Sequence, residues 1–451
     1  MNRLVVSTEC PTCGAPLDFG EGSNAVQCLH CRSQLLVTGR KRVLSYYVAP
    51  KVEAREAAVK VMCAQQEAGQ RCRISKVERY FIPYYRLTGD DLRWEKAEAP
   101  APADSEDGQL LPLDLLSLRQ RPSFGDDDEA PLSLHDRYIE RSFIACQLPE
   151  AGLYSLGIRP AVLRLLLFQG STVRALGKVV APDVGAEAAL ARGMKVAEID
   201  PILQRRVIGS LLSLVYFPYW VVEVERREAR VLSLVDAVSA AIPGLGVGAR
   251  LYDVLNRDPA ADPPSVGFRP LVCPNCGADL PVRPDDIIFF CASCESAWEI
   301  EGEELRAVTY EIGVVPGAAA GAVVKYLPFW RLEVDAPQGS PSRFFLPGFR
   351  CRRLKILVDL ARALSEHMPA GGGAFVGAEV HGCHYDRDDA RLLAELTYPE
   401  LRPRPRRAVA ELQERRLQLR TAVLVWLPFE VRGQELIDCC TGHAVSQQLL
   451  S

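Results

Sequence analysis

The sequence predicts an α+β protein in which two four-cysteine zinc ribbons are attached to an internally duplicated, strand-rich core with a few helices. Three observations predict this class. Cysteines occur twice in one paired spacing, a proline flanked by aromatic residues recurs in four strand-like segments, and amphipathic segments lie between these strands. With 451 residues, 48% of them hydrophobic and 24% charged, the chain can bury sizeable cores.

The cysteine pattern predicts two zinc sites. In both sets, 14 residues separate the inner cysteines, and Gly14 or Gly277 follows the first pair, where a metal-binding turn needs positive φ. Four thiolates form a closed tetrahedral site with no open position for water, so we expect two structural Zn²⁺ ions. A redox-active Cys-x-x-Cys pair is the alternative, but the thioredoxin-like context that it needs is absent. The predicted ligands are Cys10, Cys13, Cys28 and Cys31, and then Cys273, Cys276, Cys291 and Cys294.

The proline-centred segments read as strands because their flanks are β-branched or alternate between apolar and polar residues. They occupy residues 81–85, 216–220, 326–330 and 426–430. Proline cannot donate a hydrogen bond to a sheet, so we expect each proline at a sheet edge, a strand start or a bulge. The pattern predicts four related strands, each bent at its proline, that bury their aromatic side chains in shared cores.

The order of these features predicts an internal duplication, because ribbon and proline-centred strands follow one another in the same order in both halves. A weaker similarity between residues 157–165 and 348–356 supports it, and Pro- and Asp-rich residues 258–264 are a plausible linker. The predicted units are ribbon 1 (1–45), core half 1 (46–262, with an acidic loop insertion at 95–131), ribbon 2 (263–305) and core half 2 (306–451).

Helices are predicted at residues 51–67, 388–396 and 405–420. The last belongs to an arginine-rich segment, 402–420, which favours either a solvated helix face or contact with an anionic partner. The acidic insertion has a composition typical of a flexible loop, and its role stays open.

Catalytic motifs are lacking: the sequence has neither a G-x-x-x-x-G-K-[ST] phosphate-binding loop nor a G-x-S-x-G nucleophile turn, so we expect no enzymatic activity. One further group of potential ligands leaves a third metal site open, against the alternative that its cysteines are small core residues. The group consists of His381, Cys383, His384, Cys439, Cys440 and His443.

Charge argues against nucleic acid as the partner. The formal net charge is −4, residues 10–31 hold two acids and no Lys or Arg, and residues 273–304 hold eight acids and one arginine, Arg283. Phosphate contacts need cations, so nucleic acid is a disfavoured partner and a protein partner is expected. No signal peptide or transmembrane segment stands out, and clustered cysteines are typical of metal sites in a reducing compartment, so we predict a cytoplasmic protein and leave peripheral membrane contact open.

The two cysteine sets and the Tyr-x-Pro-aromatic-Trp strands resemble bacterial zinc-ribbon proteins of the TFIIB-type, often labelled primosomal-helicase-like. The resemblance implies zinc binding and work within a larger assembly, in some cases near membrane-stress or ATPase systems. The helicase label does not carry over, because the chain has no ATP-binding loop. Together these observations predict a non-catalytic zinc-binding scaffold or adaptor that mediates protein–protein interaction. The alternative is a nucleic-acid-binding factor of the transcription or replication zinc-ribbon type.

Overall fold

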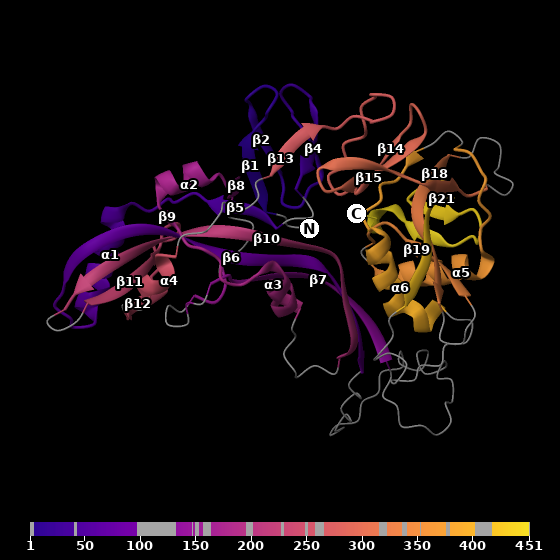
Figure 1. Cartoon of the computed structure of the whole chain (residues 1–451). Coiled ribbons are helices and arrows are strands. Elements are labelled where there is room, and N and C mark those ends of the chain that lie inside the picture. Colours follow the sequence, from indigo (N-terminus) through magenta and orange to yellow (C-terminus); the bar gives the residue numbers. More distant parts are fainter. Residues whose placement is uncertain are drawn as a thin grey trace, which may run out of the picture.

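A computed structural model describes residues 4–39, 43–96, 132–146, 148, 153–156, 164–194, 202–226, 230–248, 251–257, 266–314, 323–335, 341–351, 353–375, 379–401 and 417–450. In these residues the protein is rich in strands and has six α-helices, as expected (Figure 1). Three predicted features lie outside them wholly or for the most part: the acidic insertion, the linker 258–264 and the arginine-rich segment.

The first sheet is built around two strands of 24 residues each, which pair antiparallel along nearly their whole length. It contains ten strands in the described residues. These are β1 (Val5–Glu9), β2 (Pro16–Gly20), β5 (Leu44–Val48), β6 (Arg73–Lys96), β7 (Leu132–Ile144), β8 (Arg164–Leu167), β9 (Lys178–Val179), β10 (Ile202–Glu225), β11 (Arg230–Asp236) and β12 (Gly244–Val247).

The second sheet contains seven strands in the described residues. These are β17 (Tyr310–Ile312), β18 (Val324–Asp335), β19 (Pro341–Pro347), β20 (Glu379–Val380), β21 (Gln418–Arg432), β22 (Glu435–Asp438) and β23 (Ala444–Ser446). A 3₁₀ helix, η4 (Gln447–Leu449), follows the last strand. Residues 418–420, placed at the end of a helix by the sequence, instead begin β21, so that part of the helix prediction is wrong.

The two sheets pair their strands in the same way. β10 is antiparallel to β6 and β11 and parallel to β5, and β21 is antiparallel to β18 and β22 and parallel to β17. β6 also pairs with antiparallel β7 and parallel β9, as β18 does with β19 and β20. The first sheet has in addition β8, β1 and β2, which join it to the first ribbon.

The four prolines lie inside central strands, so the expectation of an edge, a strand start or a bulge is wrong. Each faces an aromatic residue of the long partner strand: Pro83 faces Tyr216, Pro218 faces Phe81, Pro328 faces Trp426, and Pro428 faces Tyr326. Along the opposite edge of its strand, each proline lies between the end of one neighbouring strand and the start of the next. The missing N–H of the proline therefore interrupts no strand-to-strand hydrogen bonding. The proline carbonyls accept hydrogen bonds of 2.9–3.1 Å from the N–H groups of Ala145, Ala237, Gly348 and Cys439.

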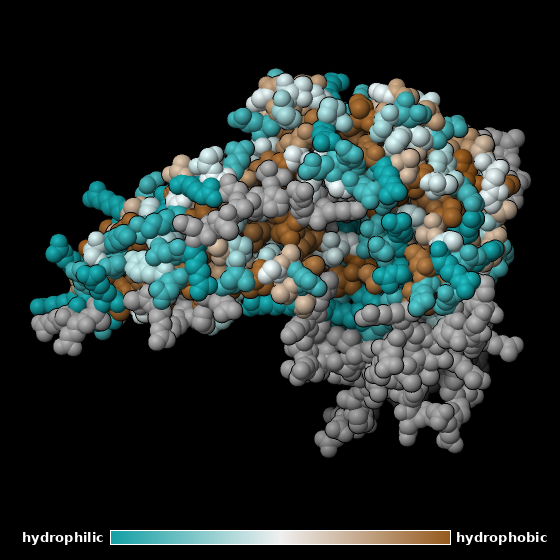
Figure 2. Space-filling model, in the orientation of Figure 1, coloured by the Kyte–Doolittle hydropathy of each residue, from teal (hydrophilic) through white to brown (hydrophobic). Residues whose placement is uncertain are grey.

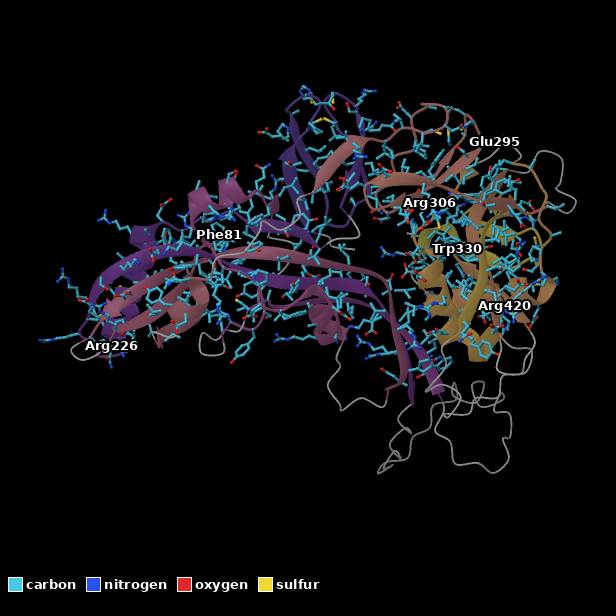
Figure 3. All side chains as sticks on the ribbon, in the orientation of Figure 1. Phe81, Arg226, Glu295, Arg306, Trp330 and Arg420 are labelled. Carbon is cyan, nitrogen blue, oxygen red and sulfur yellow. The ribbon has the colours of Figure 1, made fainter. Side chains whose placement is uncertain are left out.

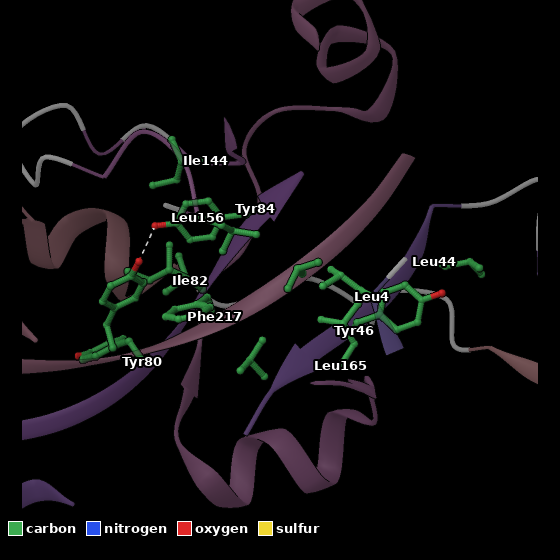
Figure 4. Packing of buried hydrophobic residues seen from close by; sticks show 14 of the residues in the cluster. Leu4, Leu44, Tyr46, Tyr80, Ile82, Tyr84, Ile144, Leu156, Leu165 and Phe217 are labelled. Carbon is green, nitrogen blue, oxygen red and sulfur yellow. Dashed lines mark hydrogen bonds between the residues drawn. The ribbon is translucent and has the colours of Figure 1, made fainter. Parts of the chain in front are cut away.

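Aromatic side chains of the proline-centred strands fill the cores, as predicted. In the first half, Tyr80, Tyr84 and Phe217 are buried in the same core cluster as Tyr46 of β5, which lies nearer Leu4 and Leu165 (Figure 4). The hydroxyl groups of Tyr84 and Tyr219 lie 3.0 Å apart, so both phenols keep a hydrogen bond inside the core.

The described residues form six helices: α1 (Ala54–Glu67), α2 (Gly170–Leu176), α3 (Ala186–Met194), α4 (Leu251–Leu255), α5 (Leu354–His367) and α6 (Arg387–Leu401). α1 and α6 confirm the helices predicted at 51–67 and 388–396. α5 was not predicted, although it buries Leu357, Leu360 and Leu364 against the second sheet. No helix in the described residues combines the length and the apolar character needed to cross a membrane.

The long strands join the two halves of the molecule. In Figure 1 they run from the outer end of the first sheet to the side of α6. There the buried Trp94 of β6 donates a 2.8 Å hydrogen bond from Nε1 to the carbonyl oxygen of Leu396, and Arg350 Nε lies 3.2 Å from a carboxylate oxygen of Asp90. Figure 2 shows hydrophilic residues over the outer end and hydrophobic residues on the surface near the ribbons and the second sheet.

Two small sheets complete the two ribbons, and the cysteine turn between β1 and β2 belongs to the first large sheet. The first consists of β13 (Gly267–Pro270), β4 (Gln34–Thr38) and β3 (Ala25–Gln27), and the second of β14 (Ile288–Cys291), β15 (Ser296–Glu301) and β16 (Glu304–Val308). β13 leads into the second cysteine set but pairs with β4 of the first. The two ribbons therefore lie side by side at the top of Figure 1.

Candidate metal centres

The structure brings each predicted set of four cysteines together. Cys10 and Cys13 lie in the turn between β1 and β2, and Cys28 and Cys31 in the turn between β3 and β4. The four Sγ atoms lie within 4.8 Å of one another, with Cys10–Cys31 and Cys13–Cys28 separations of 3.8 Å. Cys10 and Cys28 are buried, whereas Cys13 and Cys31 are exposed.

The second set has the same arrangement. Cys273 and Cys276 follow β13, and Cys291 and Cys294 lie where β14 turns into β15. The four Sγ atoms again lie within 4.8 Å of one another, and the Cys273–Cys294 and Cys276–Cys291 pairs are 3.6 Å apart. These are the two groups of potential metal ligands in the described residues.

The sulfur separations fit one small tetrahedral metal ion in each set. Zinc–thiolate bonds of about 2.3 Å at tetrahedral angles place sulfur atoms about 3.8 Å apart. The shorter contacts in the two sets, 3.6–3.8 Å, lie close to this value, and a disulfide would need about 2.05 Å. Each set can therefore hold a metal ion, and all four ligand positions are supplied by the protein.

Backbone hydrogen bonds shape the cysteine turns. The N–H of Gly14 donates to the carbonyl oxygen of Cys10, and that of Gly277 donates to Cys273, both at 2.8 Å. Gly14 and Gly277 have φ of 71° and 74°, which confirms the role predicted for them. In the second turn of each ribbon the same position is held by Arg32 and Glu295, with φ of 61° and 51°.

Gly277→Ala should lower the free energy of unfolding by about 1 kcal/mol, because an alanine Cβ disfavours left-handed backbone. No atom lies within 4 Å of that Cβ, so the effect is conformational and not steric. The matched control is Gly185→Ala, which also meets no atom within 4 Å but lacks positive φ. Thermal unfolding of the zinc-loaded chain measures both. Equal midpoints for the two variants would show that the turn does not depend on glycine.

Two serines support the thiolates, and the sequence reasoning missed them. Ser33 Oγ lies 3.1 Å from Cys31 Sγ, and Ser296 Oγ lies 3.0 Å from Cys294 Sγ. Hydrogen bonding to Ser33 lowers the pKa of Cys31 to about 6, and Ser296 likewise lowers the pKa of Cys294. Both shifts favour the thiolate, which is the form that binds metal. The signal was available, because each serine stands two residues after the fourth cysteine of its set.

The two cysteine sets share a hydrophobic core. Cys273 and Cys291 are buried together with Ala25 and Leu36 of the first ribbon. The N–H of Asn24 donates a 2.6 Å hydrogen bond to the carbonyl oxygen of Pro284 in the second ribbon. The ribbons therefore support one another, beyond the strand pairing of β13 with β4.

The possible third metal site does not assemble in the described residues. His381, Cys383 and His384 follow β20, whereas Cys439, Cys440 and His443 follow β22, so that β18 and β21 separate the two groups. Cys383 is buried and contacts the carbonyl oxygen of Tyr385 through Sγ. Burial lowers the pKa of His381 to about 4, which keeps its ring neutral at physiological pH. The alternative of small core cysteines thus fits Cys383.

No family model matches the chain, and no match is found among the curated proteins or the solved structures. The resemblance to bacterial zinc-ribbon proteins therefore stays a prediction from the cysteine spacing and the proline-centred strands.

Proposed function

We propose that the protein is a non-catalytic scaffold, stabilised by two structural zinc ions, that binds other proteins within a larger cytoplasmic assembly. The observation that carries the zinc assignment is the convergence of four Sγ atoms in each set, at separations of 3.6–3.8 Å for the closest pairs. Four thiolates fill the coordination sphere, so each ion would hold two hairpin turns together and activate no water.

We further propose that the α+β core arose by duplication of one unit. The support is the shared strand order of the two sheets and the shared register of their prolines and aromatic residues. A second parallel lies in the turn after β11 and β22, where Asp236 and Asp438 each accept two backbone N–H bonds. Repeated register over several strands is hard to obtain by chance, because one residue of slippage turns every side chain to the other face.

Protein is the favoured partner because the second ribbon presents acids. Glu301, Glu303 and Glu304 are exposed on the second ribbon, together with Asp279 and Glu295. The two acids between Cys10 and Cys31 lie beside cations: buried Glu21 pairs with Arg86, and Asp18 lies 3.5 Å from Arg164. A surface with excess carboxylates repels nucleic-acid phosphates and attracts basic groups.

Equilibrium binding separates the scaffold from a nucleic-acid factor. We expect the full zinc-loaded chain to show no tight binding to labelled duplex or single-stranded DNA at about 150 mM salt. Affinity purification from the native host should recover a defined set of proteins, which a variant with both zinc sites removed fails to retain. Tight DNA binding that weakens steeply with added salt would overturn the proposal.

A further inference from the structure

A pocket of about 540 Å³ opens between the second ribbon and the second sheet. Its size is typical of sites that accept a small molecule or one or two side chains of a partner. We call it the ribbon pocket, and the residues that the argument uses are Asp279, Phe290, Glu295, Phe375, His381 and Trp426. They come from both turns of the second cysteine set and from β14, β21 and the segments on either side of β20.

Aromatic rings form one wall of the ribbon pocket. The ring centroids of Phe290 and Phe375 are 4.7 Å apart, and those of Phe290 and Trp426 are 5.6 Å apart. Tyr310 packs behind them, 5.1 Å from Trp426, and its hydroxyl donates to the carbonyl oxygen of Glu295. This bond ties the aromatic wall to the cysteine turn. Phe290 and Phe375 are only half-buried, so the rings have surface left for an occupant.

The ribbon pocket has two exposed acids at its rim and one arginine in its lining, Arg283, which lies near a buried carboxylate. Asp279 and Glu295 are exposed there, and neither has an ion-pair partner among the described residues. Figure 3 shows Glu295 on the second ribbon beside the second sheet. Arg283, also in the lining, lies 3.8 Å from the buried Asp286, and His381 is neutral because burial lowers its pKa to about 4.

Three other acids of this ribbon, at its far hairpin, are paired with arginines. Glu303 and Glu304 lie 3.7 Å and 3.8 Å from the guanidinium nitrogens of Arg269, and Glu301 lies 3.0 Å from Arg306. These three acids away from the pocket are thus paired within the chain, whereas the two acids at its rim are left for an external cation. A zinc ion held by four thiolates adds a formal charge of −2 next to the rim.

We propose that the ribbon pocket receives an arginine side chain from a basic segment of the partner protein. This proposal deepens the scaffold function and rests on it. A planar guanidinium can stack on the rings of Phe290 and Phe375 while its N–H groups donate to the rim carboxylates. Arginine is favoured over lysine because the ammonium group is more strongly hydrated and cannot stack. A phosphate ligand is disfavoured by the same carboxylates.

Fluorescence anisotropy of the full zinc-loaded chain tests this proposal. The probe is a short fluorescein-labelled peptide with one arginine among glycines and serines, and the comparison peptides carry glutamine or lysine instead. We expect the arginine peptide to bind more tightly than either. The double variant Asp279→Asn with Glu295→Gln should weaken binding of the arginine peptide about tenfold or more. Phe375→Leu should weaken it too, because an aliphatic side chain offers no ring to stack on.

The matched control is the double variant Glu303→Gln with Glu304→Gln, which makes the same change in net charge on the same ribbon. We expect it to bind the arginine peptide within about twofold of the parent. Equal weakening by the two double variants, or equal binding of the arginine and glutamine peptides, would overturn the proposal. The proposal would also be overturned if the parent chain self-associates and the double variant Asp279→Asn with Glu295→Gln does not. A second copy of the chain would then be the occupant of the ribbon pocket.

The outcomes also separate this proposal from the scaffold function. Zinc content measured on each variant shows whether the ribbon has kept its metal. If the variant that disrupts the ribbon pocket keeps zinc and still retains the purified partners, the pocket assignment fails and the scaffold stands. If the parent chain binds DNA tightly and retains no protein, the scaffold function itself fails.

Discussion

Replacing Cys273 by serine should remove one of the two zinc ions and unfold the second ribbon. Cys273 is 2% exposed and packs in the core that the two ribbons share, where Leu36 of the first ribbon also lies. Loss of the metal would therefore let the cysteine turns move and disturb the packing of both ribbons. Structural zinc contributes on the order of 10 kcal/mol to the folding of small zinc domains, which makes this the largest effect we expect from any single substitution. Metal analysis should fall from two zinc ions to one.

Limited proteolysis shows how far the damage extends. We expect cleavage in the second ribbon of Cys273→Ser, and increased cleavage in the first ribbon because β13 no longer holds β4. The control is Cys63→Ser, which replaces an exposed thiol outside both cysteine sets and should leave the zinc content unchanged. Zinc content that stays at two in Cys273→Ser would contradict the ligand assignment.

Trp94→Ala should cost about 3–5 kcal/mol of unfolding free energy, the usual price of truncating a buried large aromatic side chain. Trp94 is 2% exposed and packs, with Leu92 and Ile208, in the core of the second half although it lies on β6. The substitution therefore opens a cavity at the junction of the two halves. Trp94→Phe keeps most of the volume and loses the 2.8 Å bond to Leu396, so it should cost less.

Chemical denaturation measures the effect. Tyr154→Ala is the matched control, because this aromatic side chain is 69% exposed and its loss should change stability by less than about 0.5 kcal/mol. A loss below about 1 kcal/mol for Trp94→Ala would mean that the long strands do not hold the two halves together.

The cysteine sets were predictable because the short sequence spacing of the cysteines is enough to indicate metal ligands. A Cys-x-x-Cys turn places Cys10 and Cys13 on one side of an ion whatever the rest of the chain does. The same spacing recurs at Cys273 and Cys276, which favoured metal binding over other roles for these cysteines. The proline-centred strands were predictable for a related reason, since their aromatic residues mark buried positions on paired strands.

Features that depend on distant contacts were not predictable. The prolines are tolerated inside central strands because neighbouring strands change partner there, and nothing near Pro83 or Pro218 in the sequence marks that change. The sequence similarity suggested that Gly348 corresponds to Gly157 of the first half. In the structure Gly348 corresponds to Ala145, because the N–H groups of both donate to the carbonyl oxygen of a strand proline. Residues 157–163 themselves lie outside the described part of the chain.

The ribbon pocket shows the same limit. Phe290, Phe375 and Trp426 come from three separate parts of the chain, and their meeting depends on how the second ribbon docks on the second sheet. Acidic composition at residues 273–304 was visible in the sequence. Only the structure separates acids that pair with Arg269 or Arg306 from those at the rim.

Metal analysis combined with X-ray absorption at the zinc edge tests the central claim most directly. The full chain, purified without added metal or chelator, should contain two zinc ions per chain, each surrounded by four sulfur atoms at about 2.3 Å. Fewer than two zinc ions that no added zinc restores, or a coordination sphere with oxygen or nitrogen in place of sulfur, would contradict the two closed four-thiolate sites.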